Sequence, residues 1–106
     1  MKVICWDKWE GDKNWFMVEE SPTSYYRIIR EAETLHVCHT TKVIYSLDDK
    51  THRHPYCQNS ECIGFKRYNS PEQAVIVLND ARQNPERFIE RVKRADFPHF
   101  LNLAVQ

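Results

Sequence analysis

The chain has 106 residues, 42% of them hydrophobic and 28% charged, and its 15 basic and 15 acidic residues give a formal net charge of zero. This size and composition suit one globular domain over residues 1–106 and argue against a disordered chain. A neutral balance also argues against a basic nucleic-acid binder steered by phosphates and against a strongly acidic mimic of DNA.

The sequence carries no recognisable targeting or membrane signal. Residues 1–7 hold too few apolar side chains for the apolar region of a secretory signal, and no apolar run approaches the roughly 18 residues of a membrane span. We therefore expect a cytoplasmic protein with no membrane partner. In a reducing compartment, metal binding or burial explains four cysteines better than disulfides do.

The N-terminal region predicts a β-hairpin. Residues 2–9 and 14–20 are rich in aromatic and β-branched side chains, and a polar segment with Gly11 separates them. The hairpin carries all three tryptophans of the chain: Trp6, Trp9 and Trp15. Core packing is their ordinary role, and an exposed aromatic surface that binds a partner is the alternative.

Residues 21–32 predict an amphipathic helix laid on the sheet. Ser21 suits the N-cap of a helix and Pro22 its first position. Apolar side chains then recur at i, i+3, i+4 and i+7, which defines one helical stripe of Tyr25, Ile28, Ile29 and Ala32.

The middle of the chain predicts short strands around a loop. Residues 35–38 and 42–47 are rich in valine, isoleucine, threonine and tyrosine, which favours strands. Residues 51–60 show no periodicity and include a proline, which predicts a loop. We expect a last strand at residues 63–68.

Capping residues predict two further helices. Ser70, Pro71 and Gln73 combine an N-cap, a proline at the first position and the partner of a capping box. Asn84 and Pro85 repeat the cap and the proline before a second helix.

The outer face of the last predicted helix carries a row of arginines, Arg87, Arg91 and Arg94. A solvated face is the ordinary interpretation of such a row, and contact with phosphates or a partner is the alternative. Residues 99–106 are unusually apolar for a chain end. We expect Phe97, Phe100 and Leu101 to pack on the domain or to enter a partner, which includes a second copy of the chain in a homodimer.

The stretch from His36 to Cys62 concentrates the metal-binding side chains. It holds four of the five histidines and three of the four cysteines, which are the ligand types that Zn²⁺ prefers. Cys57 and Cys62 form one ligand pair, and the second pair joins Cys38 to one of the histidines. The set that we predict for a structural zinc ion is Cys38, His54, Cys57 and Cys62.

We predict no catalytic residue from the sequence. The stretch contains carboxylates near its histidines, as a metal-dependent hydrolase or nuclease would need, but no placed general base. The signature of the zinc deaminases and the elbow motif of serine hydrolases are missing. Only two glycines occur, which also excludes glycine-rich phosphate-binding loops.

Together these features predict an α+β domain with an antiparallel sheet of four to five strands, one early helix and two to three C-terminal helices. We expect a small non-enzymatic regulatory or inhibitory protein that acts by protein–protein contact, a role that would suit a phage or mobile-element inhibitor of a host enzyme or defence complex. A zinc-stabilised nucleic-acid-binding module is the alternative, and a small metal-dependent hydrolase or nuclease is the second. The predicted partner-binding residues are Trp6, Trp9, Trp15, Arg87, Arg91, Arg94, Phe97, Phe100 and Leu101.

Overall fold

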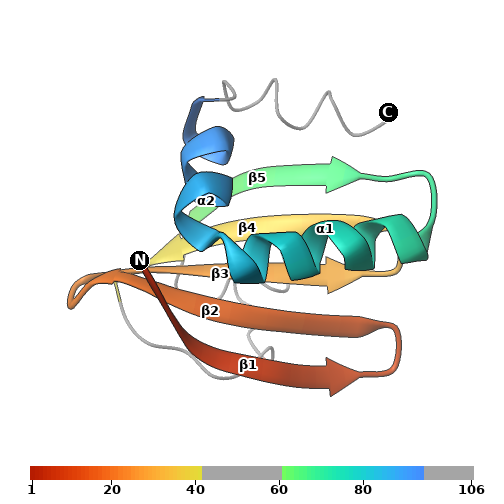
Figure 1. Cartoon of the computed structure of the whole chain (residues 1–106), viewed down its shortest axis with the longest axis horizontal. Coiled ribbons are helices and arrows are strands. Elements are labelled where there is room, and N and C mark those ends of the chain that lie inside the picture. Colours follow the sequence, from red (N-terminus) through yellow and green to blue (C-terminus); the bar gives the residue numbers. More distant parts are fainter. Residues whose placement is uncertain (42–60, 95–106) are drawn as a thin grey trace.

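The computed structural model describes residues 1–41 and 61–94, and only the backbone of residues 6–8, 10, 61 and 62. In this part of the chain a five-stranded antiparallel sheet precedes two helices (Figure 1). The elements are β1 (Lys2–Glu10), β2 (Lys13–Ser21), β3 (Ser24–Glu31), β4 (Thr34–Thr40), β5 (Glu61–Arg67), α1 (Pro71–Gln83) and α2 (Pro85–Arg94). The strands lie in the sheet in chain order, so each pairs with the next.

An antiparallel sheet with C-terminal helices was predicted, and the structure confirms it. The N-terminal hairpin and both capped helices lie where the sequence placed them. Three expected features lie outside the described residues: the strand at 42–47, the loop at 51–60 and the apolar tail at 99–106. No helix of the described segments is long and apolar enough to cross a membrane.

The early helix predicted for residues 21–32 is wrong, because this segment forms the strand β3. Its alternate side chains enter opposite faces of the sheet. Tyr26 and Ile28 join the cluster on one face, whereas Tyr25 and Ile29 join the cluster on the other.

Burial on both faces of β3 explains why the helix prediction is wrong. Residues 25–30 are all buried, whereas a helix with one apolar stripe would bury only about half of them. Their aromatic and β-branched content favours a strand. Pro22, which suits the start of a helix, instead lies in the turn between β2 and β3.

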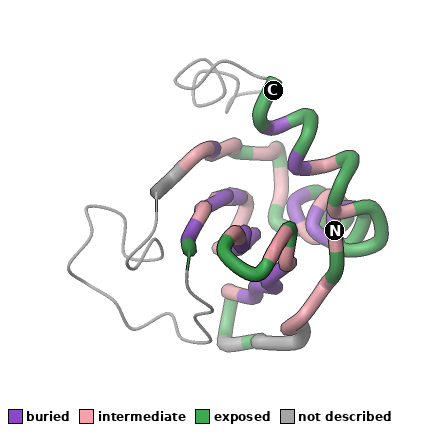
Figure 2. Tube along the Cα trace, turned by 90° about the vertical axis from the view of Figure 1, so that its left-hand side faces the viewer, coloured by how far each residue is buried: buried purple, intermediate pink, exposed green. Residues whose placement is uncertain are grey.

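Both helices pack on one face of the sheet, α1 against β3 and β4 and α2 against β5 (Figure 1). Figure 2 shows buried positions along the strands and at intervals along both helices, as expected for helices with one face on a sheet. The buried cluster between the two layers contains Phe16, Val18, Tyr26, Ile28, Leu35, Val37, Leu78, Ala81, Ile89 and Val92.

The opposite face of the sheet is buried as well. Its cluster contains Trp15, Met17, Tyr25, Ile29 and Cys38. Arg27 lies fully buried on this face, and its guanidinium carbon is 5.7 Å from the centroid of the Trp15 ring.

The start of α1 follows the predicted capping box in part, because the side chain of Gln73 bonds the residue before the N-cap and not the N-cap itself. The backbone N–H of Gln73 donates to Ser70 Oγ at 3.2 Å, and the side-chain oxygen of Gln73 accepts from the N–H of Asn69 at 3.0 Å. The bond to Ser70 satisfies an amide group that a helix start would otherwise leave without a partner.

Candidate functional site

A buried arginine organises the end of the sheet at which the β1–β2 and β3–β4 turns lie. Arg30 is only 3% exposed. Its Nε donates to Asn14 Oδ1 at 2.7 Å, and its Nη1 donates to the carbonyl oxygen of Ala32 at 2.8 Å. A charge taken out of water needs such partners, which here are a side chain of β2 and a backbone carbonyl group of the β3–β4 turn.

Trp9 lies on this arginine and remains 60% exposed. The guanidinium carbon of Arg30 is 5.1 Å from the centroid of the Trp9 ring, which is a cation–π distance. The contact orients a large aromatic side chain that the core does not enclose.

Backbone contacts make the two turns one unit. The N–H of Ala32 donates to the carbonyl oxygen of Asp12 at 3.0 Å, so the β3–β4 turn is bonded to the β1–β2 turn. Ala32 has a φ of 51° and Gly11 a φ of 59°, a left-handed region that is easy for glycine and strained for alanine. We call Trp9, Asp12, Asn14, Arg30 and Ala32 the hairpin platform.

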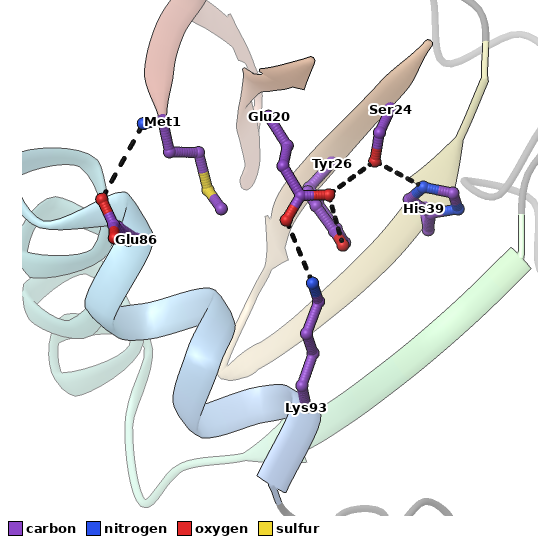
Figure 3. A network of polar contacts seen from close by, with 7 residues as sticks. All are labelled: Met1, Glu20, Ser24, Tyr26, His39, Glu86 and Lys93. Carbon is purple, nitrogen blue, oxygen red and sulfur yellow. Dashed lines mark hydrogen bonds and ion pairs between the residues drawn. The ribbon is translucent and has the colours of Figure 1, made fainter.

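A second group of polar side chains lies at the other end of the helix-covered face (Figure 3). Glu20 of β2 is its centre, because it accepts three hydrogen bonds. Its Oε1 accepts from Ser24 Oγ at 2.8 Å and from the Tyr26 hydroxyl at 3.3 Å, and its Oε2 accepts from Lys93 Nζ at 3.1 Å. His39 Nε2 is 2.8 Å from Ser24 Oγ, and its ring centroid is 5.0 Å from that of Tyr26. We call these five side chains the polar cluster.

The polar cluster brings a serine and a histidine together, but not as a nucleophile and its base. The hydroxyl of Ser24 has one proton, which it donates to Glu20. We therefore assign the proton in the contact between Ser24 and His39 to His39 Nε2. A histidine in that state cannot take the serine proton, as nucleophilic catalysis requires.

The negative charge of Glu20 favours the same assignment of the shared proton to His39. The hydrogen bond from Ser24 and then that from Lys93 lower the pKa of Glu20, because both stabilise the carboxylate. Hydrogen bonds with Tyr26 and with Glu20 raise the pKa of Lys93. The cluster is thus an ion pair with hydroxyl partners that joins β2, β3, β4 and α2.

The structure separates the predicted partner-binding residues. Trp15 is 2% exposed and belongs to the core, whereas Trp9 is mostly exposed. The α2 arginines Arg87, Arg91 and Arg94 are exposed. The side chain of Trp6 and residues Phe97, Phe100 and Leu101 lie outside the described part of the chain.

Trp9 and α2 lie at opposite ends of β2. Trp9 pairs with Asn14 near the start of that strand, and Lys93 of α2 bonds Glu20 near its end. Six residues of strand separate these two positions by about 20 Å. The described residues therefore present two separate candidate surfaces.

Cys38 is the one predicted zinc ligand whose side chain the structure describes. It is fully buried in β4 and disulfide-bonded, which corrects the expectation that burial or metal binding rather than disulfides explains the cysteines, whereas Cys5 is not part of a disulfide. Thiolates bind metals, so Cys38 would serve as a ligand only after reduction. Cys62 pairs with Cys38 in the register of β4 and β5.

Other predicted ligands are divided between faces or lie outside the described residues. His36 and Cys38 share one face of β4, and His39 points to the other. His54 and Cys57 lie outside the described residues, and no metal-binding group of three or more side chains occurs within them.

A small basic surface joins β5 to α2. Lys66 Nζ lies 5.1 Å from the centroid of the Tyr68 ring. Burial raises the pKa of the Tyr68 hydroxyl, and the charge of Arg91 opposes this rise. Arg91 is thus close enough to Tyr68 to act on it electrostatically.

Sequence reasoning missed Arg30 and most of the polar cluster. Arg30 and Ser24 fall in the segment that was predicted as a helix, where arginine is ordinarily a solvated residue. A strand pattern would have placed Arg30 on the same face as Tyr26 and Ile28, next to the hairpin turn.

Comparisons of this chain with protein-family models, curated proteins and solved structures found no match.

Proposed function

We propose that this protein is a small non-enzymatic binding module that regulates or inhibits a protein partner, and that the hairpin platform is its contact surface. One observation carries the proposal. A tryptophan 60% exposed lies over a buried arginine, and the hydrogen bonds of this arginine go to the Asn14 side chain and the Ala32 carbonyl group. Tryptophan is among the side chains most enriched in the residues that dominate binding energy at protein interfaces.

The rigidity of the hairpin platform supports this role. Binding costs free energy when side chains must be ordered, and a ring already held in place avoids part of that cost. The hydrogen bond between the two turns and the stacking on Arg30 order Trp9 before any partner arrives. The polar cluster supports a non-enzymatic role, because its serine proton is donated to a carboxylate.

The test compares two exposed hydrophobic side chains. Immobilised protein would capture partners from the source cells, and the affinity of each purified partner would be measured for the wild type, Trp9→Ala and Ile76→Ala. Ile76 of α1 is 68% exposed and is the matched control. We expect Trp9→Ala to weaken binding at least about tenfold and Ile76→Ala to leave it unchanged.

Folding must be checked before these affinities are compared. Trp9 is mostly outside the core, so we expect Trp9→Ala to unfold within a few degrees of the wild type. Equal affinity of the two variants would contradict the role of the hairpin platform. Failure of the wild-type protein to retain any partner would contradict the proposal as a whole.

A zinc-stabilised nucleic-acid-binding module is the second candidate, and the basic surface favours it. Lys66 and Arg91 both act on Tyr68, which places two cations beside an aromatic ring that could stack on a base. The test is the anisotropy of labelled single-stranded RNA and DNA at increasing salt, with Arg91→Ala as the variant. Binding that does not weaken with salt, or that survives Arg91→Ala unchanged, would count against this candidate.

A further inference from the structure

We draw no further inference here: the strongest candidate, the polar cluster at the end of the helix-covered face, has its carboxylate, hydroxyl and ammonium groups bonded to one another, and nothing in the described structure points to a ligand that would use it.

Discussion

Replacing Arg30 with methionine would remove the charge and the hydrogen-bond donors at the centre of the hairpin platform while keeping a long, flexible side chain. Asn14, which accepts from Arg30 Nε, is itself only 4% exposed. Water therefore cannot readily replace the lost donor at its Oδ1. The carbonyl oxygen of Ala32 loses its side-chain donor as well.

The expected change in the free energy of unfolding follows from these contacts. A buried acceptor left without its donor costs about 1–3 kcal/mol, and Asn14 falls in this class. Loss of stacking on the exposed Trp9 ring adds about 0.5–1 kcal/mol. We expect Arg30→Met to lower the free energy of unfolding by about 1.5–4 kcal/mol, a large part of the stability of a domain of this size.

The assay is urea unfolding followed by circular dichroism, with Arg67→Met as the control. Arg67 also forms a charged hydrogen bond, with Glu33 at 3.0 Å, but its side chain is 52% exposed. An exposed pair is worth less than about 1 kcal/mol, so the control should change little. The double variant Arg30→Met/Asn14→Ala should be more stable than the sum of the single effects predicts, because it also removes the acceptor that was left alone.

Two results would refute this reasoning. One is an equal loss of stability in Arg30→Met and Arg67→Met, which would mean that burial of Arg30 adds nothing. The other is strict additivity of Arg30→Met and Asn14→Ala, which would mean that their hydrogen bond contributes no coupling. Partner binding gives an independent readout, because a Trp9 ring without its stacking cation should bind more weakly even where the variant is folded.

Three further predictions concern charge, strain and metal. The hydrogen bond from Ser24, followed by that from the lysine of α2, lowers the pKa of Glu20 from 4.5, so its stabilisation exists above that pH and is lost as the pH falls through the lowered value. The Tm difference between the wild type and Glu20→Gln should therefore be constant near neutral pH and close in acid, and a constant difference at all pH values would contradict it. Ala32→Gly should stabilise the protein by up to about 1 kcal/mol in urea unfolding because φ is 51°, whereas Ala81→Gly inside α1 should destabilise it by about 1–2 kcal/mol, because it also removes a buried methyl group. Elemental analysis should find about one equivalent of zinc only after reduction of the Cys38 disulfide, and less than about 0.2 equivalents in the reduced protein would contradict the four-ligand site.

The elements that the sequence predicted correctly are those whose signals are local. The N-terminal hairpin follows from two β-rich runs around a turn, and α1 from a serine cap whose bond to the Gln73 N–H the structure reproduces. α2 begins at Pro85, directly after Asn84, as the cap and proline indicated. In each case, neighbouring residues contain the whole physical reason for the element.

β3 shows where local signals fail. Tyr25, Ile28 and Ile29 lie at helical spacing, but the same residues alternate well enough to serve both faces of a sheet. Whether such a segment forms a helix or a strand depends on whether other elements cover both of its faces. That is decided by α1, far along the chain, on one face, and on the other by Trp15, Met17 and Cys38 of the flanking strands.

The candidate site was predictable only in part, for the same reason. Trp9 was named as a partner-binding residue from its type alone, whereas the arginine that orients it comes from a different hairpin. The polar cluster is even less local, because Lys93 and Glu20 are 73 positions apart. Such contacts follow from the register of the sheet and the path of α2, which the sequence pattern did not supply.

The polar groups at the two ends of the helix-covered face are arranged in opposite ways. This difference favours a role in binding over a role in catalysis. In the polar cluster, the most reactive groups satisfy one another: the serine proton goes to a carboxylate, and the carboxylate also holds an ammonium group. In the hairpin platform, a buried charge is fixed by two hydrogen bonds and leaves its apolar neighbour Trp9 facing solvent. Folding alone gains little from an aromatic ring that stays mostly in water, since burial is what makes such a ring stabilising. A partner that covers Trp9 would gain that burial without paying to order the ring, which is why loss of binding in Trp9→Ala with unchanged folding is the decisive result.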